Sequence, residues 1–361
     1  MKLPYAINKN KSLRFLYTLL AGLLGGFVFS FFHLPLPWVL GPMVFSIILT
    51  MTVEEAYAPP SGRLFGFFIL GIALGLYFVP EMGIVILSHF DIVIITTLIT
   101  LILGLLNGYI FKKIFNFDWM TAIFGSIPGG LVQMVEIGGE LGGKREIIAI
   151  QQTLRVILVV VIIPSVLLFV PQSSTPASLM TTASSEFDLF QFILLIGLGG
   201  LGVIIGKFMR MPILFMMGPM VVVAVVSLCG VSLAAIPSPL LHSAQMFIGI
   251  SIALNFKRSN LLEYRKYLLL GLFAGITLTA MSFMTAWLLK VWANLDWLTA
   301  ILSTAPGGIA EMSVTAVAVN AAVPLVAAFQ IVRMILAMVV LPKIIVIILR
   351  KNRVKSETLG Q

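Results

Sequence analysis

Long apolar stretches, separated by short polar connections, follow one another along almost the whole chain. In the first half they cover residues 13–32, 36–53, 64–80, 92–111, 119–138 and 146–170. Most approach the roughly 20 residues that an α-helix needs to cross a bilayer. The alternation of polar and apolar residues that marks a transmembrane β-strand is missing from runs such as 156–163. The pattern therefore predicts an all-α, polytopic membrane protein.

The second half of the chain repeats the first. The segment 34–44 returns at 211–221 with an identical Gly-Pro-Met-Val core, and Pro128-Gly129-Gly130 returns 178 residues later as Pro306-Gly307-Gly308. The same offset relates Gly71 to Gly249, Gln152 to Gln330, Arg155 to Arg333 and Pro164 to Pro342. Spacing kept without a gap over such a length indicates an internal duplication. We predict a first membrane repeat at 1–172, a polar linker at 173–184, and a second repeat at 185–361 that ends in a short basic tail.

Basic residues in the connecting loops differ systematically between the two repeats. The loop at 144–145 is basic and its counterpart at 322–323 is not. The loops at 207–210 and 257–266 are basic, whereas their counterparts in the first repeat lack Lys and Arg. Because Lys and Arg accumulate on the cytoplasmic side, the pattern predicts inverted repeats with both termini in the cytoplasm.

An inverted pair needs an odd number of spans in each repeat, so one apolar segment should fail to cross. The fifth segment is the best candidate, because the Pro-Gly-Gly sequence interrupts it in both repeats. Each remaining piece of about nine residues would reach about 13 Å, roughly half of the hydrocarbon thickness. The sequence thus predicts five spans and one broken re-entrant hairpin in each repeat. The alternative is an ordinary span with a kink, in a symmetric scaffold without a transport role.

An arginine stands near the middle of the sixth segment of each repeat, at Arg155 and Arg333. Such a charge costs about 2.5–3.5 kcal/mol on insertion scales, so a specific purpose is expected. Gln152 and Gln330 precede the arginines by three positions and share their helix face. Two roles are open: the guanidinium groups bind an anion or carboxylate, or they cap the carbonyl groups of a broken helix or hold an internal ion pair.

The two breaks supply further candidate binding groups. Hydroxyl groups precede the prolines, and the glycine N–H groups lie at the positive end of the following half-helix. Close helix packing is the alternative role of these glycines. An acid beyond the second break can pair with an arginine or exchange a proton. The predicted substrate-binding residues are Arg155, Arg333, Gln152, Gln330, Ser126, Gly129, Gly130, Thr304, Gly307, Gly308 and Glu311.

Composition narrows the class of protein. Hydrophobic residues make up 60% of the chain and charged residues only 10%, whereas soluble domains carry roughly 25% charged residues. The net charge of +9 is spread over short loops and a tail, so direct nucleic-acid binding is not expected. Cys229 lies in an apolar run and is expected to fill the core. The sequence offers no metal-ligand spacing and no catalytic or cofactor motif, so we expect neither an enzyme nor a bound metal or cofactor.

The elements Pro-x5-Gly-Pro-Met, Pro-Gly-Gly and Gln-x-x-Arg, each present twice, resemble the AbrB duplication family of bacterial membrane proteins. The resemblance implies the bacterial inner membrane. It also implies a role as a membrane regulator of gene expression or, under an older label, as an ammonia monooxygenase. A copper or iron oxygenase would need clustered histidines and carboxylates, which this sequence lacks.

Inverted repeats with paired broken helices are typical of secondary transporters. We therefore expect a transporter or permease for a small anionic or zwitterionic solute, with the lipid bilayer and that solute as partners. The alternative is a membrane-embedded regulator or sensor that affects gene expression without transport. A homo-oligomer and a cytoplasmic regulatory partner are both compatible with the sequence.

Overall fold

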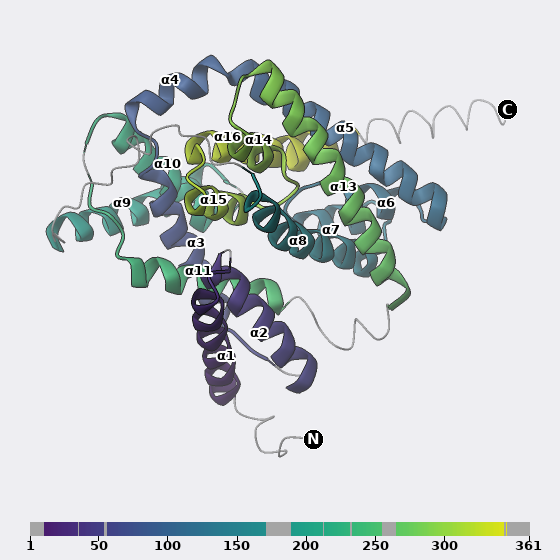
Figure 1. The fold of residues 1–361 in the computed structure, drawn as a ribbon, viewed down its shortest axis with the longest axis horizontal. Coiled ribbons are helices and arrows are strands. Elements are labelled where there is room, and N and C mark those ends of the chain that lie inside the picture. Colours follow the sequence, from purple (N-terminus) through teal and green to yellow (C-terminus); the bar gives the residue numbers. More distant parts are fainter. Residues whose placement is uncertain are drawn as a thin grey trace. The chain divides into compact units, whose positions relative to one another are not determined.

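The computed structural model describes residues 11–34, 36–53, 56–170, 189–211, 213–231, 233–254, 265–342 and 344. Every regular element within these ranges is helical (Figure 1). The all-α, polytopic fold predicted from the apolar pattern is confirmed. The predicted linker at 173–184, both termini and the basic loop at 257–258 lie outside the described residues.

The helices of the two repeats follow the same order. The first repeat forms α1 (Lys11–Phe31), α2 (Pro37–Val53), α3 (Pro60–Gly75), α4 (Pro80–Ser88), α5 (Phe90–Phe115), α6 (Trp119–Ser126), α7 (Leu131–Glu140) and α8 (Arg145–Leu167). The second repeat forms α9 (Leu189–Phe208), α10 (Leu214–Leu228), α11 (Ser238–Ala253), α13 (Arg265–Trp292), α14 (Trp297–Thr304), α15 (Ile309–Ala318), α16 (Val323–Ile335) and the π-helical turn η3 (Leu336–Val340). By length and composition, α1, α5, α8, α9 and α13 can each cross a membrane.

The duplication is visible in the backbone itself. The bounds of α3, α6 and α7 coincide with those of α11, α14 and α15 after a shift of 178 residues. Left-handed residues also recur at equivalent positions: φ is 57° at Asn116 and 49° at Asn294, and 52° at His33 and 53° at Arg210. Positive φ is uncommon for residues other than glycine. Both repeats therefore fold alike down to their turns.

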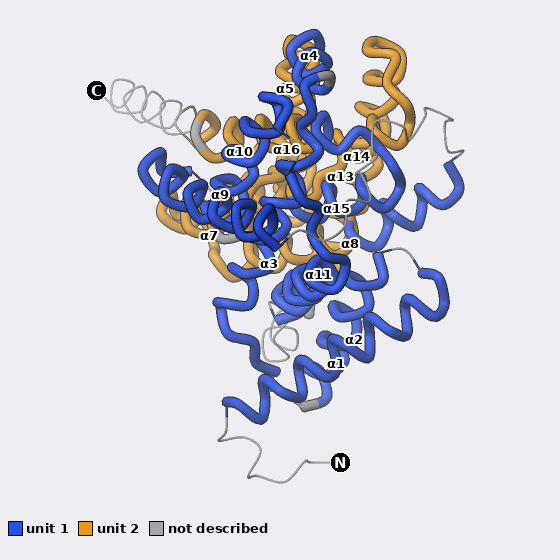
Figure 2. The backbone as a smooth tube through the Cα atoms, turned by 90° about the vertical axis from the view of Figure 1, so that its left-hand side faces the viewer, with its two compact units in different colours: residues 1–89, 160–263, 310–326 blue, residues 90–159, 264–309, 327–361 orange. Residues whose placement is uncertain are grey.

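The chain forms two compact units that do not coincide with the two repeats, as the colours of Figure 2 show. Unit 1 comprises residues 1–89, 160–263 and 310–326, and unit 2 comprises residues 90–159, 264–309 and 327–361. Unit 1 thus contains α1 to α4 and α9 to α11, whereas unit 2 contains α5 to α7, α13 and α14. Each unit takes equivalent helices from both repeats, except that α7 lies in unit 2 and most of its equivalent, α15, in unit 1.

Glycines let equivalent helix pairs approach closely within unit 1. A Cβ atom added at Gly71 of α3 would lie 2.3 Å from the carbonyl oxygen of Met216 in α10. A Cβ atom added at Gly249 of α11 would lie 2.3 Å from the carbonyl oxygen of Val39 in α2. Small residues allow such backbone contacts in membrane helices. Exchanging the repeats converts one contact into the other, so unit 1 has internal pseudo-twofold symmetry.

The long helices α5 and α13 pack together in unit 2, and each also contacts α6 and α14. Asn107 of α5 donates a hydrogen bond from Nδ2 to the carbonyl oxygen of Ala274 at 3.1 Å. Its Oδ1 accepts a hydrogen bond from Thr277 Oγ1 at 2.7 Å. Hydrogen bonds between membrane helices contribute about 0.6–2 kcal/mol each. Helices α5 and α13 are therefore joined by hydrogen bonds and together contact the short helices α6 and α14.

Two features differ from the sequence-based prediction. Helix α4 occupies a stretch expected to be only a connection, because Pro80 at its start favours the first turn of a helix. Cys229 was expected in the core but is exposed, since α10 ends at Leu228 and leaves the cysteine as its C-cap residue. The inverted orientation of the repeats and the re-entrant course of the broken segments stay predictions.

Candidate functional site

Both Pro-Gly-Gly sequences break a helix, as predicted. A half-helix of 8 residues precedes each break, and one of 10 residues follows it. Ile127 and Ala305 directly precede the prolines and have extended backbones, with ψ of 130° and 132°. This conformation is expected before proline, whose ring disfavours a helical neighbour. Asp118 and Asp296 are the N-caps of α6 and α14, because each accepts a backbone hydrogen bond in the first turn of its helix.

Gln152 and Arg155 of α8 bind the first break through its carbonyl groups. Gln152 Nε2 donates to the carbonyl oxygens of Phe124 at 2.6 Å and Ile127 at 2.9 Å. Arg155 Nη1 donates to Ile127 at 3.0 Å, and its Nη2 donates to the carbonyl oxygen of Gly129 at 3.3 Å. A helix end leaves carbonyl groups without intrahelical partners. The Gln-x-x-Arg face supplies those partners.

Gln330 and Arg333 bind the second break in the same way. Gln330 Nε2 donates to the carbonyl oxygens of Leu302 at 2.8 Å and Ala305 at 3.2 Å. Arg333 Nη1 donates to Ala305, and Nη2 donates to Gly307, both at 2.6 Å. Arg333 Nη2 also donates to Gln330 Oε1. The glutamine and arginine of this repeat therefore act as one hydrogen-bonded unit.

These contacts show that the arginines cap the broken helices, which is one of the two roles considered for them. Arg155 and Arg333 are only 3% and 4% exposed. Each break is thus bound by a buried arginine, and direct solute binding by the arginines stays a prediction.

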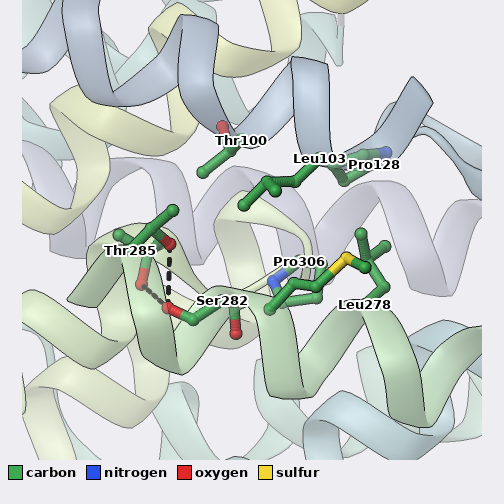
Figure 3. A pocket seen from close by; sticks show the side chains of 9 residues that line it. Thr100, Leu103, Pro128, Leu278, Ser282, Thr285 and Pro306 are labelled. Carbon is green, nitrogen blue, oxygen red and sulfur yellow. Dashed lines mark hydrogen bonds between the residues drawn. The ribbon is translucent and has the colours of Figure 1, made fainter. Parts of the chain in front are cut away.

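A small cavity, with an internal volume of about 10 Å³, adjoins both breaks within unit 2. It is lined by Thr100, Leu103, Pro128, Leu278, Met281, Ser282, Thr285, Thr304 and Pro306. Figure 3 shows Thr100 and Leu103 of α5 on one side of this space, with Ser282 and Thr285 of α13 on the other. The two prolines are equivalent residues of the duplication. The cavity therefore lies where the two repeats meet within this unit.

The predicted site residues are only partly brought together. Thr304 lines the cavity, whereas Ser126 is buried at the end of α6 and is not part of the lining. Glycines 129, 130 and 308 are half-buried in the breaks, and Gly307 is buried. Glu311 is half-buried in the first turn of α15 and belongs to unit 1. Its pairing with an arginine stays a prediction.

The sequence reasoning missed the hydroxyl groups that α5 and α13 bring to the cavity. Thr100, Ser282 and Thr285 were treated as ordinary members of apolar spans. A signal was present, because Thr279, Ser282 and Thr285 recur every three residues and so follow one face of a helix. A polar stripe along a membrane helix usually faces protein or water rather than lipid.

Comparison with known proteins identifies the family of this chain. Residues 54–348, most of the chain, match the family described as "Transition state regulatory protein AbrB". The chain belongs to the AbrB family. "Uncharacterized protein YhjN" of Bacillus subtilis (strain 168) is 29% identical over 342 residues, which cover 88% of each chain. "Putative regulator AbrB" of Escherichia coli (strain K12) is 29% identical over 308 residues, covering 84% of this chain and 87% of the relative. The AbrB resemblance inferred from the paired motifs is confirmed.

Proposed function

We propose that this AbrB-family protein is a secondary transporter for a small solute, preferably a zwitterion, in the bacterial inner membrane. The observation that carries the proposal is the unit 2 cavity, where two broken helices meet and equivalent residues of both repeats form the walls. Secondary transporters bind their solutes near the bilayer midplane, at the interface of inverted repeats and beside discontinuous helices. Inverted repeats and cytoplasmic termini belong to the same proposal.

Charge around the breaks favours a carboxylate group on the solute. Among the described residues, the hydrogen-bond partners of Arg333 are neutral oxygen atoms of Ala305, Gly307 and Gln330. Its charge is buried, because the side chain is only 4% exposed. In a low-dielectric interior, such charges act over several ångströms without direct contact. An anionic group at the second break would therefore be attracted even while Arg333 retains its carbonyl partners.

The hydroxyl groups of the cavity favour a hydrogen-bond donor at the other end of the solute. Thr100, Ser282, Thr285 and Thr304 each donate their hydroxyl hydrogen to a backbone carbonyl group. Their oxygen lone pairs then remain as acceptors. An ammonium group can donate to several such acceptors, so a zwitterion complements both the charge at the breaks and the hydroxyl lining. The small volume of the cavity restricts the solute to a small one.

The experiment measures uptake into proteoliposomes that contain the full-length protein, using a panel of radiolabelled small amino acids and monocarboxylates. Saturable accumulation supports transport. Thr285→Val should reduce it several-fold by replacing a lining acceptor with a methyl group. Thr52→Val, at an exposed residue of α2 in unit 1, is the matched control and should leave uptake unchanged. No accumulation of any member of the panel would contradict the proposal.

A membrane-embedded regulator is the second candidate, because the relative from Escherichia coli is named "Putative regulator AbrB". Such a protein would bind the same class of solute in the same cavity and signal to a partner instead of moving the solute. Thermal-shift titration of the purified protein with the same panel separates the two candidates. Saturable stabilisation that is sensitive to Thr285→Val, without accumulation in vesicles, would favour the regulator.

A further inference from the structure

The end of α6 and two consecutive glutamines of α8 carry buried polar atoms that have no hydrogen-bond partner in the described structure. These atoms are Ser126 Oγ, Gln151 Oε1 and Nε2, and Gln152 Oε1. Ser126 and Gln151 are 2% exposed, and Gln152 is fully buried. A buried polar group left without a hydrogen-bond partner destabilises the folded state. Three such side chains, which we term the first-break cluster, indicate a bound ligand.

The three side chains meet one short stretch of backbone. Gln152 Nε2 donates to the carbonyl oxygens of Phe124 and Ile127. Gln151 Oε1 lies against Gly125, where an added Cβ atom would come within 1.5 Å of it. Ser126 is the last residue of α6. The cluster therefore lies at the C-terminal end of this half-helix, and none of its three side chains is part of the cavity lining.

The equivalent positions at the second break are largely satisfied. Thr304 Oγ1 donates to the carbonyl oxygen of Ser282 at 3.0 Å, and Gln330 Oε1 accepts a hydrogen bond from Arg333. Phe329, an apolar residue only 2% exposed, takes the place of Gln151. Within the described residues, the hydroxyl of Ser303 is the polar atom left without a partner on α14. The ligand inferred at the first break is therefore not duplicated.

We propose that the first-break cluster binds a sodium ion, with Ser126 Oγ, Gln151 Oε1 and Gln152 Oε1 as ligands. Oxygen atoms of neutral groups can replace the hydration shell of an alkali cation. The C-terminal end of a half-helix carries partial negative charge, and coupling cations of transporters bind at such ends. The free Gln151 Nε2 donates to a water molecule that completes the shell.

The charge of Arg155 sets the strength of this site. Its guanidinium group bonds to Ile127 and Gly129 in the same break, so it opposes a cation nearby. Sodium alone therefore binds weakly, and a bound anionic group strengthens its binding by offsetting the positive charge. Sodium would then be the coupling ion. This coupling role rests on the transport function proposed above, whereas sodium binding by itself does not.

The test compares the melting temperature of the purified full-length protein in NaCl, KCl and choline chloride at equal ionic strength. We expect a saturable increase in NaCl alone, of about 2–4 °C at ten times the Kd. Gln151→Leu and Ser126→Ala should each remove this increase. Ser303→Ala, which deletes the unpaired hydroxyl at the second break, should retain it. Melting temperatures in choline chloride report whether each variant folds.

The outcomes separate this inference from the proposed transport function. Equal melting temperatures in all three salts for the unmodified protein would mean that the cluster holds only water, and would overturn the sodium site. A sodium effect without solute accumulation in vesicles would support the site and contradict transport. Solute accumulation that is independent of sodium would support transport and contradict the coupling role.

Discussion

Replacing Arg333 with methionine should destabilise the protein far more than the same change at an exposed arginine. Arg333 donates to the carbonyl oxygens of Ala305 and Gly307 and to Gln330 Oε1, and it is 4% exposed. Arg333→Met keeps a similar apolar length but removes the donor to Gly307 O and Gln330 Oε1, while Ala305 O keeps its hydrogen bond from Gln330. Each acceptor left without a hydrogen bond lowers stability by about 1–3 kcal/mol, but removing the desolvated charge of the arginine offsets part of this loss. We expect a net loss of about 2–4 kcal/mol in the free energy of unfolding.

The assay is SDS-induced unfolding of the purified protein in mixed micelles, followed by circular dichroism. Arg145→Met, at the exposed first residue of α8, is the control and should change the free energy of unfolding by less than about 0.5 kcal/mol. Arg333→Lys should fall between the two variants, because an ammonium group lacks the planar fork that reaches both carbonyl groups. If Arg333→Met were as stable as Arg145→Met, the guanidinium group would not stabilise the break, and the capping role would be refuted.

Three further predictions test packing, capping and topology. Gly202→Ala should lower the free energy of unfolding by about 1–3 kcal/mol, because the added Cβ would lie 2.5 Å from a carbonyl oxygen of α10. Gly200→Ala in the same helix meets open space, so it should be neutral or stabilising in the same unfolding assay. Asp118→Ala removes the N-cap of α6 and should lower stability by about 1 kcal/mol, and an unchanged unfolding midpoint would argue against the cap. In a cysteine-free background, Lys144→Cys should react with an impermeant thiol reagent only from the cytoplasm and Ala322→Cys only from outside, and labelling from one common side would contradict inverted repeats.

Local sequence signals predicted the parts of the site that depend on neighbouring residues. The prolines of the breaks and the Gln-x-x-Arg faces could both be recognised from spacing. Proline fixes its own φ and disfavours a helical predecessor, wherever the segment lies in the fold. The arginines stood out because their charge is costly in a membrane. Their carbonyl partners were considered as one of two roles, and the structure was needed to show the contacts.

Contacts between distant segments could not be predicted in this way. The hydroxyl groups of Thr100 and Ser282 did not indicate a site, because such groups can donate hydrogen bonds to backbone carbonyl groups of their own helix. The polarity of Gln151 became informative only when burial left its amide without a partner. The division into two units also depends on packing between repeats, as in the contact of Gly71 with Met216, and no local pattern reports such a contact.

The mixed origin of the two units has a consequence for biogenesis. Unit 1 needs α9 to α11 and unit 2 needs α13 and α14, so neither can be completed until the second repeat has left the ribosome. Until then, the surface of α3 around Gly71 and the surface of α5 that packs against α13 have no partner from the other repeat. A nascent first repeat should therefore depend on lipid or on insertion factors to cover those surfaces. Two half-chains produced separately should be unstable alone and recover both units only by assembling with each other.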